Sequence, residues 1–149
     1  MATTPLSLTG RALRLLSARE HSRAELVRKL TQYEEEPGAL AKVLDTLEAK
    51  DFINEGRVVE SVVHRRATKL GASRIRQELQ AKGLEPEAVA DAVNRLRVSE
   101  VERAREVWRK KFGQPPIDAA ERARQMRFLA SRGFGGDTIH KVVSGSDGE

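Results

Sequence analysis

The sequence predicts an all-α fold made of three tandem three-helix repeats. Strand-like patterns are nearly absent from the 149 residues, and apolar residues recur at helical spacing instead. Serine, aspartate, proline and glycine residues mark helix ends along the chain. Apolar stripes also return after 49 and then 50 residues, which indicates an array of similar units.

The first repeat is predicted to span residues 6–56, with "EEEPG" as an internal loop. Ser22 and Glu25 have the S-x-x-E spacing of a capping box, so a helix begins after Ser22. The next helix carries an apolar stripe at i, i+3, i+4 and i+7, formed by Leu40, Val43, Leu44 and Leu47. In "LEAKDF" we expect this helix to end with Asp51 in the left-handed position and Phe52 folded back onto Leu47.

The second repeat is predicted to span residues 57–98. Its first helix has one apolar stripe, formed by Val59, Val63, Ala67 and Leu70. The short helix within residues 69–84 has an apolar side of Ala72, Ile75 and Leu79, and Gly83 ends it in the left-handed conformation. Pro86 suits the first position of the third helix. That helix repeats the stripe of the first repeat with Val89, Ala92, Val93 and Leu96.

The third repeat is predicted to span residues 99–144, with "GQPP" as an internal loop. Trp108 continues a stripe with Val101 and Ala104, so we interpret it as a core residue. Asp118 and Glu121 resemble a second capping box, and "LASRGF" ends that helix at Gly133. The last helix restarts the repeated stripe with Ile139, Val142 and Val143. We expect Leu79, Val93, Leu96 and Leu129 to be buried, residues 1–5 to be disordered, and residues 145–149 to form a polar tail.

The positive charge of the chain is concentrated in its second and third repeats. The formal net charge is +5. Residues 6–56 hold 8 Lys and Arg against 9 Asp and Glu, residues 57–98 hold 9 against 5, and residues 99–149 hold 10 against 8. Each single basic residue is best explained as part of a solvated helix face. The excess as a whole favours contact with an anionic surface.

Several classes of function have no supporting motif. The chain has no cysteine, and its three histidines lack metal-ligand spacing. "GFGG" lacks the remaining residues of a phosphate-binding loop. Neither a signal peptide nor a membrane-spanning apolar stretch is evident, so we expect a cytoplasmic protein. No pattern predicts a catalytic site, and we expect no enzyme activity.

Taken together, these stretches resemble the RecX family of regulators of the RecA recombinase. The resemblance runs from about Gly10 to Val143 and is strongest in "RVVESVVHRRATKLGASRIRQELQAKGLEPEAV". The flanking stretches "RALRLLSAREHSRAELVRKL" and "RQMRFLASRGF" match the outer repeats. The order and spacing of the three stretches carry the resemblance, because no single motif is decisive.

The resemblance implies an elongated, curved, right-handed array of three units. It implies a monomer without cofactor or metal that binds the RecA–DNA filament, touching single- or double-stranded DNA, and mostly inhibits ATPase and strand exchange. The role would lie in homologous recombination, DNA repair and the SOS response. The alternative is a helical-repeat protein that binds DNA through phosphate contacts without a RecA partner.

Candidate partner-binding residues follow from the basic excess and from the part of the chain where the resemblance is strongest. They are Arg65, Arg66, Lys69, Arg74, Arg76 and Lys82 in the second repeat, with Arg124, Arg127 and Arg132 as an extension into the third. These residues largely avoid the apolar stripes. Arg66 lies beside a stripe, where its stem can cover apolar surface while its charge reaches water.

Overall fold

The computed structural model describes residues 6–145, and every regular element in that range is helical. The all-α prediction is therefore confirmed. The predicted disordered segment 1–5 and residues 146–149 of the predicted tail lie outside the described residues. None of the described helices is long and apolar enough to cross a membrane.

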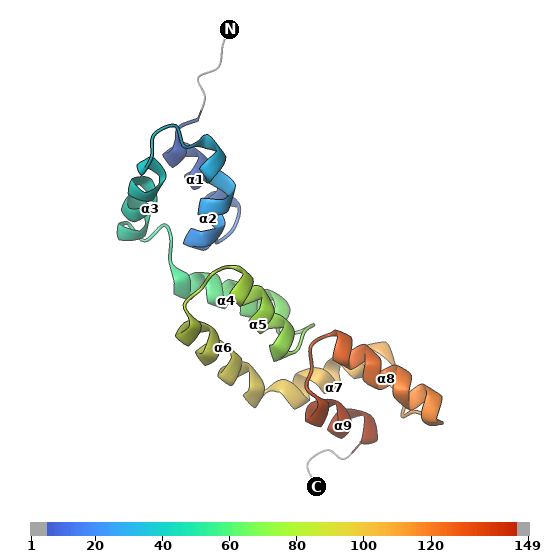
Figure 1. The fold of residues 1–149 in the computed structure, drawn as a ribbon. Helices are drawn as coiled ribbons and strands as arrows, with labels where there is room; N and C mark the ends of the chain where they lie inside the picture. The colour runs from blue at the N-terminus through green and yellow to red at the C-terminus, as the bar shows by residue number, and fades with distance from the viewer. Residues whose placement is uncertain (1–5, 146–149) are drawn as a thin grey trace.

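The described α-helices form three groups of three, here called units one, two and three (Figure 1). Unit one contains α1 (Leu8–Ala18), α2 (Arg23–Leu30), the 3-10 helix η1 (Thr31–Tyr33) and α3 (Ala39–Ala49). Unit two contains α4 (Glu55–Arg66), α5 (Ala72–Ala81) and α6 (Pro86–Val98). Unit three contains α7 (Glu100–Lys111), α8 (Ala119–Ser131) and α9 (Gly136–Ser144). Helix α4 begins two residues before the predicted repeat boundary at residue 57.

The three units follow one another along an elongated, bent path (Figure 1). Only Ser99 separates α6 from α7, so unit two passes into unit three through two nearly continuous helices. The sequence pattern predicts a second helix shorter than the first in each unit. This is wrong for unit three, where α8 has 13 residues and α7 has 12, because Asp118 caps α8 a turn earlier than the repeat requires.

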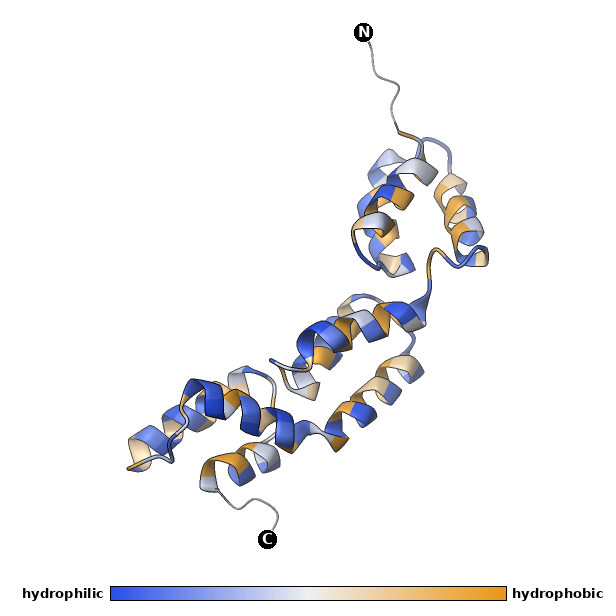
Figure 2. Ribbon diagram, turned by 180° about the vertical axis from the view of Figure 1, so that it is seen from behind, coloured by the Kyte–Doolittle hydropathy of each residue, from blue (hydrophilic) through white to orange (hydrophobic). Residues whose placement is uncertain are grey.

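Each unit has its own hydrophobic core. Leu30, Leu79 and Leu129 occupy matching positions in the three cores, with exposed fractions of 2%, 0% and 0%. Hydrophobic segments face the other helices of the same unit in Figure 2, and hydrophilic segments face outward. The predicted burial of Leu79, Val93, Leu96 and Leu129 is confirmed.

Helix α4 differs in detail from the predicted stripe. Val58 and Val62 are the most deeply buried residues of this helix, whereas Val63 is only partly buried. The reason is that α4 packs against two helices, α5 and α6, and so needs a wider apolar face than one stripe supplies. In unit three, Trp108 packs against the core as predicted, and its Nε1 donates a 2.8 Å hydrogen bond to Gln125.

The predicted capping box at the start of α2 is present with both of its hydrogen bonds, between Ser22 and Glu25. Asp118 accepts from the backbone N–H of Glu121 at the start of α8. Asp51 has φ +66, so it takes the left-handed position at the end of α3. The N–H of Phe52 donates to the Leu47 carbonyl and the N–H of Asp51 donates to the Glu48 carbonyl, which are the two hydrogen bonds of the predicted cap, while Phe52 as a whole is 46% exposed.

Gly83 ends α5 with φ +69, as predicted, but it also touches unit one. A Cβ atom at this position would lie 2.7 Å from the Cβ of Ala24. We therefore expect Gly83→Asn to lower the free energy of unfolding by about 1–3 kcal/mol, since asparagine tolerates the backbone angle but not the contact. The sequence alone predicts that Gly83→Asn is much milder than Gly83→Val, because only the backbone angle is visible in it.

Gly38 provides the matched control for this measurement in denaturant. It has φ +86, and a Cβ atom added there would have no heavy atom within 4 Å. Gly38→Asn therefore tests the backbone angle without a steric contact. Its loss of unfolding free energy should match the cost of a left-handed asparagine to within about 0.5 kcal/mol. Equal losses for the two variants would show that the contact with Ala24 contributes nothing.

Units two and three are joined by direct backbone contacts. The N–H of Gly71 donates to the Arg132 carbonyl at 2.7 Å, and the N–H of Ser73 donates to the Gly133 carbonyl at 3.3 Å. A Cβ at Gly71 would lie only 2.3 Å from the carbonyl oxygen of Gly133. Two glycines therefore let the end of α8 meet the start of α5.

Side chains strengthen the same junction. The Arg103 guanidinium donates to the carbonyls of Ala67 and Leu70, at 2.9 and 2.7 Å. The Glu100 carboxylate accepts from the N–H of Ala72 at 2.7 Å. These bonds satisfy backbone groups at the end of α4 and the start of α5, and they fix α7 against unit two.

Units one and two are joined through side chains. The Ser22 hydroxyl donates to the Lys82 carbonyl at 2.6 Å, and the Lys82 ammonium lies 3.2 Å from the Glu25 carboxylate. Burial by itself would raise the pKa of Glu25. Hydrogen bonds from Arg19, the Ser22 backbone and Lys82 outweigh burial and lower the pKa from 4.5 to about 2.

Because the folded pKa of Glu25 lies below its ordinary value, ionised Glu25 stabilises the fold above about pH 4.5. This contribution is lost as the pH falls through about 2. We expect Glu25→Gln to lower the unfolding free energy by about 2 kcal/mol at pH 7, with the difference from wild type shrinking between pH 4.5 and 2. Denaturant titrations between pH 7 and pH 2 measure this difference in unfolding free energy, and Glu102→Gln is the control. A difference that stays constant with pH would contradict the assignment.

Candidate interaction site

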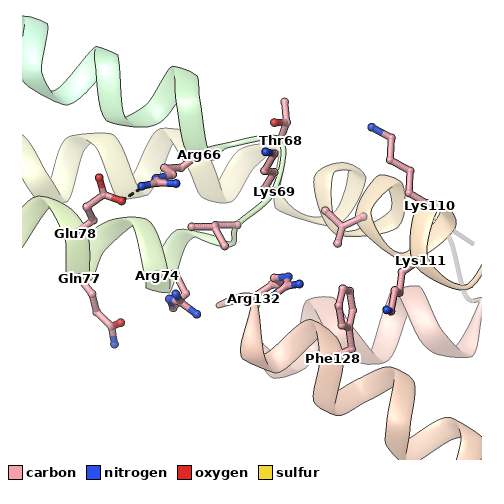
Figure 3. Close-up of a pocket in the computed structure, with 12 residues that line it drawn as sticks. Arg66, Thr68, Lys69, Arg74, Gln77, Glu78, Lys110, Lys111, Phe128 and Arg132 are labelled. Atoms are coloured by element: carbon pink, nitrogen blue, oxygen red, sulfur yellow. Dashed lines mark hydrogen bonds and ion pairs between the residues drawn. The ribbon is translucent and has the colours of Figure 1, made fainter. Parts of the chain in front are cut away.

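A groove of about 840 Å³ lies at the junction of units two and three, and we call it the basic groove. The end of α4 and the turn after it, one side of α5, the end of α7 and the end of α8 surround it (Figure 3). Six lining side chains are cationic: Arg66, Lys69, Arg74, Lys110, Lys111 and Arg132. Glu78 is the one acidic lining residue within residues 6–145. The apolar lining is Leu70, Val107 and Phe128.

Two of the cations are held in place by Glu78 and by the unit junction. Arg66 Nε lies 3.0 Å from Glu78, and Arg65 reaches the other oxygen of the same carboxylate at 3.8 Å. Arg74 Nη1 donates to the Ser131 carbonyl at 2.6 Å, across the junction. Neutralisation of Glu78 by two arginines leaves the groove with a strong positive excess.

The third unit contributes cations stacked on an aromatic ring. Arg132 lies 4.7 Å and Lys111 lies 5.4 Å from the Phe128 ring centroid. The Phe112 ring meets Phe128 edge to face at 5.4 Å. Such cation–π contacts hold charged groups near an apolar surface without neutralising them.

Four of the nine sequence-predicted site residues line this groove: Arg66, Lys69, Arg74 and Arg132. Arg65 is adjacent, through its pairing with Glu78. Arg76 lines different hollows, together with Arg97. The exposed side chain of Arg127 is not among the groove-lining residues.

Two further predicted site residues already have partners elsewhere in the chain. Lys82 lies at the junction of units one and two, where its side chain is only 12% exposed against Glu25. Arg124 pairs with Glu121 and lies over the Phe112 ring. Both positions therefore have a structural partner of their own.

Sequence reasoning missed Lys110, Lys111 and Phe128 as groove residues. The run "RKK" at 109–111 marks a basic end of α7 and was the available signal. The sequence does not show that these side chains face the groove, because the side of α7 that faces unit two depends on how α7 packs against α8 and α9. No group of three or more His, Cys, Asp or Glu residues suited to a metal occurs among residues 6–145.

Comparison with known proteins explains the threefold arrangement. Models of the first, second and third three-helix domains of RecX match residues 10–47, 54–93 and 99–143, in that order. The chain belongs to the RecX family. The matches follow the three units of the structure and cover most of the chain.

Relatives in the RecX family match the chain over nearly its whole length. The regulatory protein RecX of Leptothrix cholodnii is 56% identical over 144 residues, covering 97% of this chain and 92% of the relative. The RecX of Ralstonia nicotianae is 46% identical over 143 residues, covering 96% and 90%. A crystal structure of RecX from Lactobacillus salivarius has the same fold, with a TM-score of 0.74, 20% identity and 93% coverage of both chains.

Proposed function

We propose that this RecX-family protein binds the RecA filament on DNA and restrains its ATPase and strand-exchange activities. Relatives from several bacteria carry the name regulatory protein RecX, which supports a regulatory role. The protein acts by binding, as a cytoplasmic monomer without a cofactor. Its role belongs to recombination and DNA repair.

The observation that carries the proposal is the basic groove at the junction of units two and three. Among the residues that the structure describes, six cations and a single carboxylate line it, and that carboxylate is already paired. A filament of protein on DNA presents anionic side chains and phosphates together, and a cationic groove on an elongated array suits such a surface. We place the contact on Lys69, Lys110 and Lys111, with Arg66, Arg74 and Arg132 around them.

The second candidate function is DNA binding through phosphate contacts without RecA. The charge excess of the basic groove favours it equally, since phosphate contacts need only positive side chains. High salt weakens both modes of binding, so salt dependence does not separate them.

The test is the ATPase activity of RecA on single-stranded DNA, titrated with this protein. The proposal expects inhibition at amounts of protein far too low to cover the DNA. Inhibition that begins only when the DNA is nearly covered would show competition for DNA and would favour the second function. Absence of inhibition at every ratio would refute the proposed function.

A further inference from the structure

The basic groove is lined both by cations without a carboxylate partner in the described part of the chain and by apolar side chains, and this combination restricts what can occupy it. Lys69, Lys110 and Lys111 are exposed, and none has a carboxylate within ion-pair distance among residues 6–145. Their charges are available to a ligand. At least two anionic groups of a ligand could therefore be paired at once.

Part of the groove lining is apolar. Leu70 comes from the turn after α4, and Val107 comes from α7. Both are partly buried, each packed at the edge of its own unit core. A ligand that carries only charges would leave this surface in contact with water, whereas an aliphatic side chain would cover it.

The aromatic residue of the groove is poorly placed to stack on a nucleobase. Arg132 and Lys111 lie over Phe128, and Phe112 meets it edge to face. Proteins that bind single strands use aromatic faces as platforms for successive bases. Leu70 and Val107 offer no such platform. The lining therefore favours a polypeptide over a nucleic acid strand.

We propose that the basic groove binds an acidic segment of the partner protein. Two or more of its carboxylates pair with Lys69, Lys110 and Lys111, and one aliphatic side chain packs on Leu70 and Val107. The inference rests on the proposed function, because the partner is the recombinase in its filament. It adds that protein, rather than DNA, occupies this groove.

Site-specific photocross-linking identifies the occupant. Thr68 lines the groove, is exposed and is uncharged, so p-benzoylphenylalanine at this position removes none of the cations. The full-length variant is irradiated with RecA filaments on single-stranded DNA, and the adducts are identified by mass spectrometry. The same photoreactive residue at Asp91, exposed on α6, is the control.

The expected product is an adduct between position 68 and a recombinase segment with at least two Asp or Glu residues. An adduct with DNA, or with a segment that lacks carboxylates, would overturn the inference. An equal yield from position 91 would also overturn it, since the contact would then not be local. The inference would also be overturned if position 68 gave no adduct while the variant still inhibited the ATPase.

A second arm tests the apolar contact. The cross-linked segment is synthesised as a free peptide, and its aliphatic residue is replaced by serine. We expect this replacement to weaken binding about tenfold, measured by fluorescence anisotropy. Unchanged affinity would overturn the proposed packing on Leu70 and Val107.

Parallel ATPase measurements separate this inference from the proposed function. If the wild-type protein inhibits RecA but position 68 reacts only with DNA, the proposed function stands and the inference fails. If the wild-type protein does not inhibit at any ratio, the proposed function fails and the inference fails with it.

Discussion

Replacement of Lys69, Lys110 and Lys111 by alanine is expected to remove most of the inhibition of RecA while leaving the fold intact. The three side chains are exposed and make no ion pair within residues 6–145. An exposed pair contributes about 0.2–1 kcal/mol, and a well-formed charge-assisted bond about 1.5–3 kcal/mol. Loss of three contacts of about 1 kcal/mol each weakens filament binding about 100-fold. Titration of the ATPase with wild type and variant measures the shift.

The matched control removes three charges from unit one, at Arg14, Lys42 and Lys50. These residues are exposed and form no ion pair among the described residues. Arg19 and Arg28 are unsuitable for this control, because Arg19 pairs with Glu25 and Arg28 donates to the Ala81 carbonyl. If the control variant loses as much inhibition as the groove variant, the total charge of the protein decides binding and the groove does not.

Leu79→Ala is expected to lower the free energy of unfolding by about 2–5 kcal/mol. Leu79 is 0% exposed at the centre of unit two, and its removal leaves a cavity that the close-packed helices cannot fully close. Leu129→Ala in unit three should cost a similar amount, since Leu129 holds the matching position and is equally buried. Urea titrations followed by circular dichroism measure both.

Gln80→Ala is the control for Leu79→Ala, because Gln80 is the next residue of α5 and is exposed. It should change stability by no more than about 0.5 kcal/mol. A cost below about 1 kcal/mol for Leu79→Ala would contradict the packing of α5 in unit two.

Most of the fold could be predicted because its signals are local. The Ser22 capping box, the first-position Pro86 and the left-handed Gly83 each depend on a few neighbouring residues, and all three are present as predicted. The repeated stripe identified the buried positions because one helix face packs in each unit. The cap at Asp51 follows from local residues in the same way, since Asp51 has φ +66 and the N–H of Phe52 donates to the Leu47 carbonyl.

The candidate site was predictable only in part, because it is built from two units. Charge and resemblance pointed to residues 65–82, and Lys69 and Arg74 do line the groove. The contribution of Lys110 and Lys111 depends on the junction at Gly71 and Gly133, which sets the orientation of unit three. Lys82 looked equivalent to its neighbours in sequence, but the pairing partner Glu25 lies 57 residues away in unit one.

The most direct test compares the affinity of the protein for RecA-coated and for naked single-stranded DNA at the same salt concentration. Our account predicts tighter binding to the coated strand, and a loss of that preference in the variant lacking Lys69, Lys110 and Lys111. Equal affinity of the wild-type protein for the two strands would contradict it.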